Sequence, residues 1–169
     1  MNIFFLIGFM GSGKTHWGKK WAALGEYVFI DMDEVIEKKE GMPISTIFEQ
    51  KGESYFRNLE TEVLHSFEKA ENVIISCGGG TPCFNDNMDW MNKHGVTIYL
   101  QATPKQLALR LRTEKDKRPL LKDIPDSLLE ATIQEKLAQR ESVYLQAKII
   151  LESEVITTET FSALQIDKQ

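Results

Sequence analysis

A glycine-rich segment near the start of the chain constrains its fold most strongly. Residues 8–15 read GFMGSGKT, which fits the pattern of a glycine, four residues and then Gly-Lys-Ser/Thr that is typical of phosphate-binding loops. Residues 2–7 before it are almost wholly apolar, as in a strand that is buried on both faces of a parallel sheet. Residues 15–24 after it read as a helix with apolar side chains on one side. The sequence therefore predicts strand, loop and helix in the order that the motif requires.

The chemistry of such a loop follows from its backbone. Glycines let the chain curl so that amide N–H groups point inward, and the N-terminus of the following helix adds partial positive charge. We expect Lys14 to reach the β- and γ-phosphates of a nucleotide and the Thr15 hydroxyl to bind Mg²⁺. The alternative is a glycine-rich turn that matches the pattern by chance, and the flanking strand and helix disfavour it.

Strands and helices alternate along the rest of the chain. Further strands are predicted at 27–30, 72–76, 96–100 and 148–151, and the two longest helices at about 53–70 and 126–147. This alternation predicts a three-layer α/β fold, in which a parallel sheet is covered by helices on both faces, as a single domain over residues 1–169. Ligands of such sheets bind at the carboxyl ends of the strands.

Composition and charge narrow the classes of partner. The net charge of −5 and the pI near 5.3 argue against nucleic acid. No apolar run is long enough to span a membrane, and the N-terminal apolar run lacks the basic flank of a signal peptide. Cys77 and Cys83 are the only cysteines and have no metal-ligand spacing. We expect a cytoplasmic enzyme that is monomeric by default.

Two aspartates follow the second predicted strand. Asp31 and Asp33 are separated by one residue, so both side chains can face one cleft. Beside a nucleotide loop, one carboxylate can hold a water of Mg²⁺ and the other can meet the acceptor hydroxyl. The alternative is helix capping, because Asp31 and Glu34 have the spacing of a capping box. Capping would explain only one of the two aspartates.

The third predicted strand ends in Gly78, Gly79 and Gly80, where many phosphate-loop ATPases have the aspartate that organises Mg²⁺. The metal carboxylate is therefore expected from Asp31. Glycines allow a ligand to lie against the backbone and offer N–H donors. The alternative interpretation is a mobile loop.

Three charged side chains interrupt the apolar faces of the two long helices. Glu60 falls within the first apolar face and Arg57 at its edge, and Arg140 falls within the second. We expect the two arginines to meet an anionic substrate, since the guanidinium fork suits a carboxylate, and Glu60 to orient Arg57. The alternatives are a local Arg57–Glu60 ion pair worth a few tenths of a kcal/mol and extension of Arg140 to solvent.

A charged segment at about 113–124 is expected to form a lid. Arg112 lies just before it and Arg118 within it. One arginine would lie near the nucleotide and the other would close on the transferring phosphoryl group. The alternative is a solvated loop, and the phosphate loop upstream favours the lid.

Together these segments resemble the shikimate kinase family over nearly the whole chain, and only the tail after Leu151 matches poorly. The matching segments are GFMGSGKT at 8–15, FIDMDEVIE at 29–37, IFEQKGESYFRNLE at 47–60, SCGGGTP at 76–82, RPLL at 118–121 and QRESVYLQAK at 139–148. The resemblance implies a single kinase domain with a five-stranded parallel sheet of order 2-3-1-4-5. It also implies Mg²⁺-dependent transfer of the ATP γ-phosphoryl group to the 3-hydroxyl of shikimate, in aromatic amino-acid biosynthesis.

The resemblance further implies roles for single residues, with a substrate-binding region at about 33–60. Shikimate would be held by Asp33, Arg57, Gly79 and Arg140, and the nucleotide phosphates by Gly11, Ser12, Gly13, Lys14, Thr15 and His16. Thr15 and Asp31 would hold Mg²⁺, and Lys14, Asp33 and Arg118 would act in catalysis. Arg112 would stack on adenine, although its spacing from Arg118 is one residue shorter than in the family.

Three other functions compete with this interpretation. Gluconate kinases share the Asp-x-Asp element, but the chain lacks their adjacent His-Pro element. A nucleoside monophosphate kinase needs a base-reading pocket, for which the sequence gives no sign. A nucleotide-binding regulatory module without activity is disfavoured because Lys14, Thr15, Asp33 and Arg118 are all present.

Overall fold

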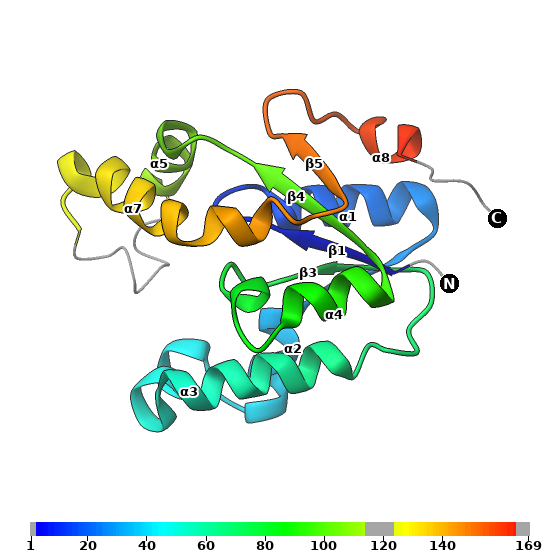
Figure 1. Cartoon of the computed structure of the whole chain (residues 1–169), viewed down its shortest axis with the longest axis horizontal. Coiled ribbons are helices and arrows are strands. Elements are labelled where there is room, and N and C mark those ends of the chain that lie inside the picture. Colours follow the sequence, from blue (N-terminus) through cyan, green and yellow to red (C-terminus); the bar gives the residue numbers. More distant parts are fainter. Residues whose placement is uncertain (1–2, 114–123, 165–169) are drawn as a thin grey trace.

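A five-stranded parallel sheet lies between two layers of helices (Figure 1). The computed structural model describes residues 3–113 and 124–164. The strands are β1 (Ile3–Ile7), β2 (Val28–Asp31), β3 (Val73–Ser76), β4 (Val96–Gln101) and β5 (Ile149–Glu152). Their order across the sheet is β2-β3-β1-β4-β5, and every neighbouring pair is parallel. The predicted fold class and strand order are confirmed.

The predicted helices are present, with small shifts at their ends. They are α1 (Lys14–Gly25), α2 (Met32–Glu40), α3 (Ile44–His65), α4 (Asn87–His94), α5 (Pro104–Arg112), α7 (Asp126–Tyr144) and α8 (Thr160–Ala163), with a 3-10 turn, η1 (Thr81–Cys83). α3 begins before the helix predicted at about 53–70 and kinks at Gly52, where φ is 80° and ψ is 170°. α3 ends at His65 instead of near residue 70, because turns replace the helix beyond it.

Side chains of β1 alternate between two cores, as the geometry of a strand requires. Ile3, Phe5 and Ile7 join the large core formed with α2, α3, α4, α5 and α7. Phe4 and Leu6 face the opposite way, into a smaller core under α1 and α8. Both faces of the central strand are therefore buried, which explains its unbroken apolar sequence.

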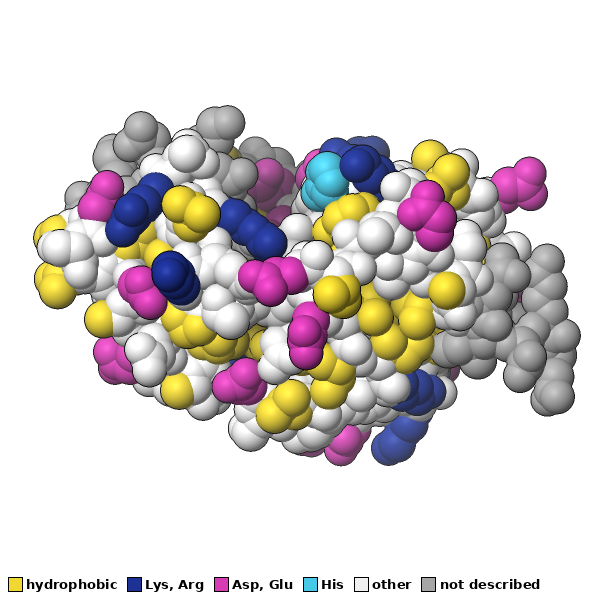
Figure 2. All heavy atoms as spheres, turned by 90° about the horizontal axis from the view of Figure 1, so that it is seen from above, with side chains coloured by type: hydrophobic (Ala, Val, Ile, Leu, Met, Phe, Trp, Pro, Cys, Tyr) yellow, Lys and Arg dark blue, Asp and Glu magenta, His cyan; other side chains and the backbone are white. Residues whose placement is uncertain are grey.

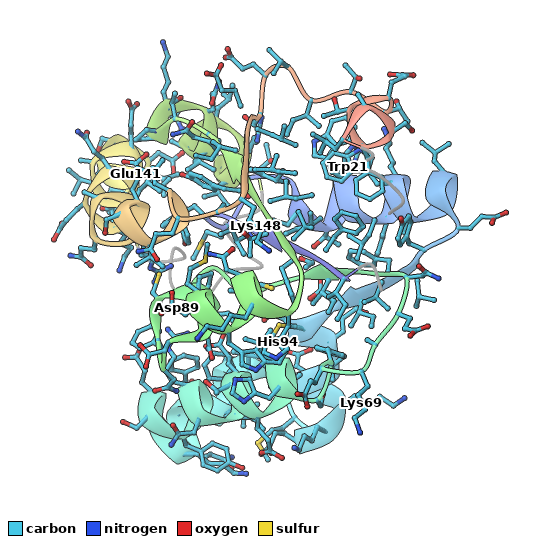
Figure 3. All side chains as sticks on the ribbon, turned by 45° about the vertical axis from the view of Figure 1, so that its right-hand side comes forward. Trp21, Lys69, Asp89, His94, Glu141 and Lys148 are labelled. Carbon is cyan, nitrogen blue, oxygen red and sulfur yellow. The ribbon has the colours of Figure 1, made fainter. Side chains whose placement is uncertain are left out.

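An aromatic contact joins α8 to the helix of the phosphate-binding loop. Trp21 of α1 lies beneath α8 (Figure 3), where its ring stacks on Phe161 with the centroids 5.4 Å apart. Its indole N–H donates to the carbonyl oxygen of Thr157 at 3.3 Å. The segment after β5 is thus fixed to α1, on the side of the sheet away from α3 and α4 (Figure 1).

The strand order determines where a ligand binds. The chain leaves β1 toward β2 and β3 on one side and later returns to β4 and β5 on the other. A crevice forms where the order reverses, at the carboxyl end of β1, and residues 8–13 begin there.

On the face seen in Figure 2, acidic and basic side chains are interspersed with apolar ones.

Within residues 3–113 and 124–164, no helix has the length and apolar character needed to cross a membrane.

Candidate active site

A cleft of about 800 Å³ opens at the carboxyl ends of β1, β2 and β3. Its wall includes the phosphate-binding loop and the first turns of α1, the two aspartates at the end of β2, and residues 76–79 at the end of β3. Arg110, Thr113 and Ser153 line it as well. The three strand ends that the sequence singled out therefore share one cleft.

The loop at residues 8–13 has the backbone of an anion cradle. Gly13 precedes α1 with φ at 98°, in the left-handed region where glycine is favoured, and Gly11 has φ at 80°. The Lys14 side chain is buried, and its ammonium donates to the carbonyl oxygens of Gly8 at 2.8 Å and Phe9 at 3.0 Å. The ammonium thus lies over the loop, where phosphate groups would bind.

The Asp31 carboxylate makes two hydrogen bonds, and one of them is the helix cap that the sequence offered as an alternative. Its Oδ1 accepts a hydrogen bond from the amide of Asp33 at 3.1 Å, so it caps α2. Its Oδ2 accepts from the Thr15 hydroxyl at 3.0 Å. One carboxylate therefore ends β2, starts α2 and reaches the first turn of α1.

Asp33 has an unusual protonation equilibrium. Desolvation by the surrounding protein, together with the negative charges of Asp31 and Glu60, raises its pKa from 3.8 to about 6, while Lys14 opposes the rise. Its side chain is nevertheless exposed to the open cleft. Solvent in the cleft therefore limits this desolvation. A carboxylate with a raised pKa is better suited to accept a proton than an ordinary aspartate.

Glu60 is buried and fixes Arg57. Its Oε2 accepts from Nη1 of Arg57 at 2.6 Å, and its Oε1 accepts from the Thr81 hydroxyl at 2.6 Å. The side chain of Glu60 is only 2% exposed. Glu53, 59% exposed, contacts the other edge of the guanidinium at 3.0 Å. The local ion pair that the sequence offered as an alternative exists, and the hydrogen bond to Thr81 ties it to the turn that follows the three glycines.

Two arginines flank the glycine segment after β3. A Cβ on Gly80 would lie 2.5 Å from Nη1 of Arg57, so only glycine allows this approach. A Cβ on Gly79 would lie 3.5 Å from Nη1 of Arg140. Neither guanidinium belongs to the wall of the cleft itself. Both lie beside its glycine segment, brought there from α3 and α7.

The two arginines of α5 lie differently with respect to the cleft. Arg112 is exposed at the end of α5 and is not part of the cleft wall. Arg110 is part of it, and its guanidinium donates to the carbonyl oxygen of Gly11 at 3.2 Å and to the hydroxyl of Ser153 at 3.2 Å. No sequence pattern distinguished Arg110, because only the folded sheet brings Ser153 near it.

Ser12 and His16, which were predicted to contact phosphate groups, differ in their exposure. Ser12 is buried, whereas His16 is exposed and lines the cleft. The predicted lid, apart from its two ends, lies outside the described residues, and Arg118 lies there with it. Tyr144 of α7 is a site residue that the sequence analysis did not identify, and its hydroxyl donates a hydrogen bond to the carbonyl oxygen of Gly79. Its spacing of one helical turn from Arg140 was the available sign.

Comparison with known proteins agrees with this geometry. The shikimate kinase family profile matches residues 10–168. The shikimate kinase of Parabacteroides distasonis is 43% identical over 160 residues, which cover 95% of this chain and 92% of that protein.

Solved structures agree as well. The crystal structure of shikimate kinase from Bacteroides thetaiotaomicron superimposes with a TM-score of 0.87 at 41% identity, covering 90% of this chain and 87% of the other. Shikimate kinase from Acinetobacter baumannii, in complex with shikimate, gives a TM-score of 0.86 at 27% identity, with 99% and 96% covered. The chain therefore belongs to the shikimate kinase family, whose members are ATP-dependent phosphotransferases with an alcohol acceptor.

Proposed function

We propose that this protein transfers the γ-phosphoryl group of ATP to the 3-hydroxyl of shikimate, giving shikimate 3-phosphate and ADP. One observation carries the proposal beyond family membership. The phosphate-binding loop, the Asp33 carboxylate and a glycine segment flanked by two arginines meet at one cleft. A phosphate donor, a proton acceptor and a binding region for an acid are the three parts that this reaction needs.

The residues near the loop fit a Mg²⁺ ion that binds together with the nucleotide. Thr15 and Asp31 offer oxygen ligands 3.0 Å apart, and oxygen is the ligand that Mg²⁺ prefers. In the described part of the chain, no group of three or more His, Cys, Asp or Glu residues could hold a metal alone. Such a site suits an ion held by one or two protein groups and by phosphates. When bound, the ion would neutralise charge on the β- and γ-phosphates.

The remaining nucleotide contacts follow from the loop. Gly11 to His16 would surround the phosphates, and the Lys14 ammonium would exchange the carbonyls of Gly8 and Phe9 for phosphate oxygens. Arg110, which lines the cleft, is the better placed of the two arginines of α5 to meet the nucleoside. Arg118 would contact the transferring phosphoryl group from the lid.

Shikimate would bind through its carboxylate. Arg57 and Arg140 supply the positive charge, and the segment Gly78–Gly80 supplies backbone donors. Glu60, held by Thr81, keeps the guanidinium of Arg57 in place. The acceptor hydroxyl would then face Asp33.

Asp33 would orient the hydroxyl and receive its proton. With a pKa of about 6 it is largely ionised at neutral pH, yet basic enough to accept a proton as the new bond forms. Because the transition state of phosphoryl transfer is loose, alignment contributes as much as basicity. We further propose that the protein acts as a cytoplasmic monomer.

A coupled assay for ADP release tests the proposed function. Purified protein is given ATP and Mg²⁺ with shikimate, with gluconate or with a nucleoside monophosphate. We expect ADP release that depends on shikimate. Release driven equally by gluconate or by a nucleotide acceptor would contradict the proposal.

A further inference from the structure

After β3, the three glycines and the threonine that follows them, residues 78–81, all have carbonyl oxygens that are bonded within the protein. Four consecutive carbonyl oxygens accept hydrogen bonds: that of Gly78 from the Thr81 amide at 3.1 Å, Gly79 from the Tyr144 hydroxyl at 2.5 Å, Gly80 from the Cys83 amide at 2.9 Å and Thr81 from the Asn87 side chain at 2.9 Å. Within the described residues, the amides of the three glycines meet no acceptor. The segment therefore presents donors and withholds acceptors, as an anion-binding backbone must.

The Gly79 carbonyl depends on a distant residue. The other three carbonyls are bonded by groups within residues 81–87, whereas Tyr144 lies on α7, 65 positions away along the chain. Its ring is fully buried and packs on Tyr99 of β4, with the centroids 5.1 Å apart. Burial raises the pKa of the Tyr144 hydroxyl well above its usual range, so the group stays protonated and donates. Tyr144 follows Arg140 by one helical turn and is the last residue of α7, three positions after Glu141, which is labelled in Figure 3.

Because the peptide bond is planar, the hydrogen bond from Tyr144 to the Gly79 carbonyl also affects the amide of Gly80. In a trans peptide the C=O of one residue and the N–H of the next point in opposite directions. Holding the Gly79 carbonyl against Tyr144 therefore also fixes the direction of the Gly80 N–H. Because glycine occupies both sides of this peptide, the backbone itself offers little resistance to its rotation. A rotated peptide would turn a carbonyl oxygen toward a bound acid.

We propose that Tyr144 is a positioning residue for the acidic substrate. Its hydroxyl holds the Gly79–Gly80 peptide so that the segment offers N–H groups, and it ties that segment to the helix that carries Arg140. The backbone donors and one of the two arginines thus keep a fixed relation to each other. This inference rests on the proposed function, because shikimate is the acid that these groups would bind.

Two matched variants test it. Tyr144→Phe keeps the buried ring and removes the hydroxyl. Tyr99→Phe removes a hydroxyl from the other ring of the same pair, and that hydroxyl is buried without a hydrogen-bond partner in the described structure. Calorimetric titration measures the affinity of each variant for shikimate and for ATP with Mg²⁺, and thermal unfolding confirms that both are folded.

We expect Tyr144→Phe to weaken shikimate binding about tenfold, which corresponds to the loss of about 1.4 kcal/mol. Its ATP affinity should stay within about twofold of the wild type, and Tyr99→Phe should change neither affinity. Unchanged shikimate affinity in folded Tyr144→Phe, or an equal loss of ATP affinity, would overturn the inference while leaving the proposed function intact. A wild-type protein that binds no shikimate would overturn both the inference about Tyr144 and the proposed function.

Discussion

The hydroxyl of Thr15 donates a hydrogen bond to Oδ2 of Asp31 at 3.0 Å, which joins the first turn of α1 to the end of β2. The other carboxylate oxygen of Asp31 accepts from the amide of Asp33. This single side chain thus connects the phosphate-binding loop, the proposed metal site and Asp33, the residue proposed to face the acceptor.

Replacement of Asp31 by Asn should weaken the response to metal without harming the fold. Asparagine caps a helix about as well as aspartate, so α2 keeps its start. It lacks the charge that would hold Mg²⁺ and its waters, so the Mg²⁺ concentration for half-maximal activity should rise about tenfold or more. Titration of activity with Mg²⁺ at saturating ATP measures this. An unchanged Mg²⁺ requirement would exclude Asp31 from the metal site.

Glu60 and Glu53 both contact Arg57, and their variants should behave differently. Glu60→Gln removes the buried one of the two carboxylates that pair with Arg57 and disturbs Thr81, so shikimate affinity should fall about tenfold or more and the melting temperature should drop. Glu53→Gln changes an exposed pair and should cost at most about 0.5 kcal/mol of stability. Shikimate titration and thermal unfolding of both variants test this. Equal losses of shikimate affinity and of melting temperature in the two variants would contradict the special role of the buried Glu60.

Gly80→Ala should weaken shikimate binding by moving Arg57. The added methyl group would lie 2.5 Å from Nη1, well inside van der Waals contact, so the guanidinium must shift. We expect at least about a tenfold loss of shikimate affinity, because a displacement of about 1 Å in a binding group is costly. ATP affinity, measured in the same titrations, serves as the control. Wild-type affinity for shikimate in Gly80→Ala would place the bound acid away from Arg57.

The raised pKa of Asp33 predicts how its removal changes stability with pH. Between pH 3.8 and about 6 the folded protein binds a proton at Asp33 that the unfolded chain does not, so stability falls as pH rises through this window. Asp33→Asn removes the cost of the ionised group. The variant should therefore melt above the wild type at pH 7, and the two should converge near pH 4. Because Asp33 is exposed to the cleft, we expect a modest difference.

Activity should respond to the same substitution in the opposite direction. Wild-type turnover should fall as pH drops through about 6, where Asp33 becomes protonated, and Asp33→Asn should lose about 10² or more in turnover. Asp86→Asn, at an exposed position outside the cleft, controls for the loss of one negative charge. Near-wild-type turnover in Asp33→Asn would contradict the catalytic role of Asp33. An unchanged melting temperature at pH 7 would contradict the raised pKa of its carboxyl group.

The fold was largely predictable from the sequence because local patterns and the sheet agree. The apolar segment before Gly8 forms β1, and the predicted alternation of strands and helices forms a parallel sheet between helices. The charged residues on apolar helix faces, Glu60 and Arg140, identified positions beside the cleft, because burial of a charge requires a partner.

The rest of the site depends on contacts between distant segments. Arg110 meets Gly11 and Ser153 across separations of 99 and 43 residues, which no local pattern reports. Tyr144 looks like an ordinary apolar position on α7, because a buried tyrosine shows its hydroxyl partner only in the folded protein. The end of α3 was misplaced because residues beyond His65 keep helical composition while forming turns.

The position of the new phosphate on shikimate tests the central claim most directly. A reaction with ATP, Mg²⁺ and shikimate is run to completion, and the product is examined by proton–phosphorus correlation NMR. The account predicts one phosphorylated product, in which phosphorus couples to the proton on carbon 3. A phosphate on another hydroxyl, or inorganic phosphate with unchanged shikimate, would contradict it.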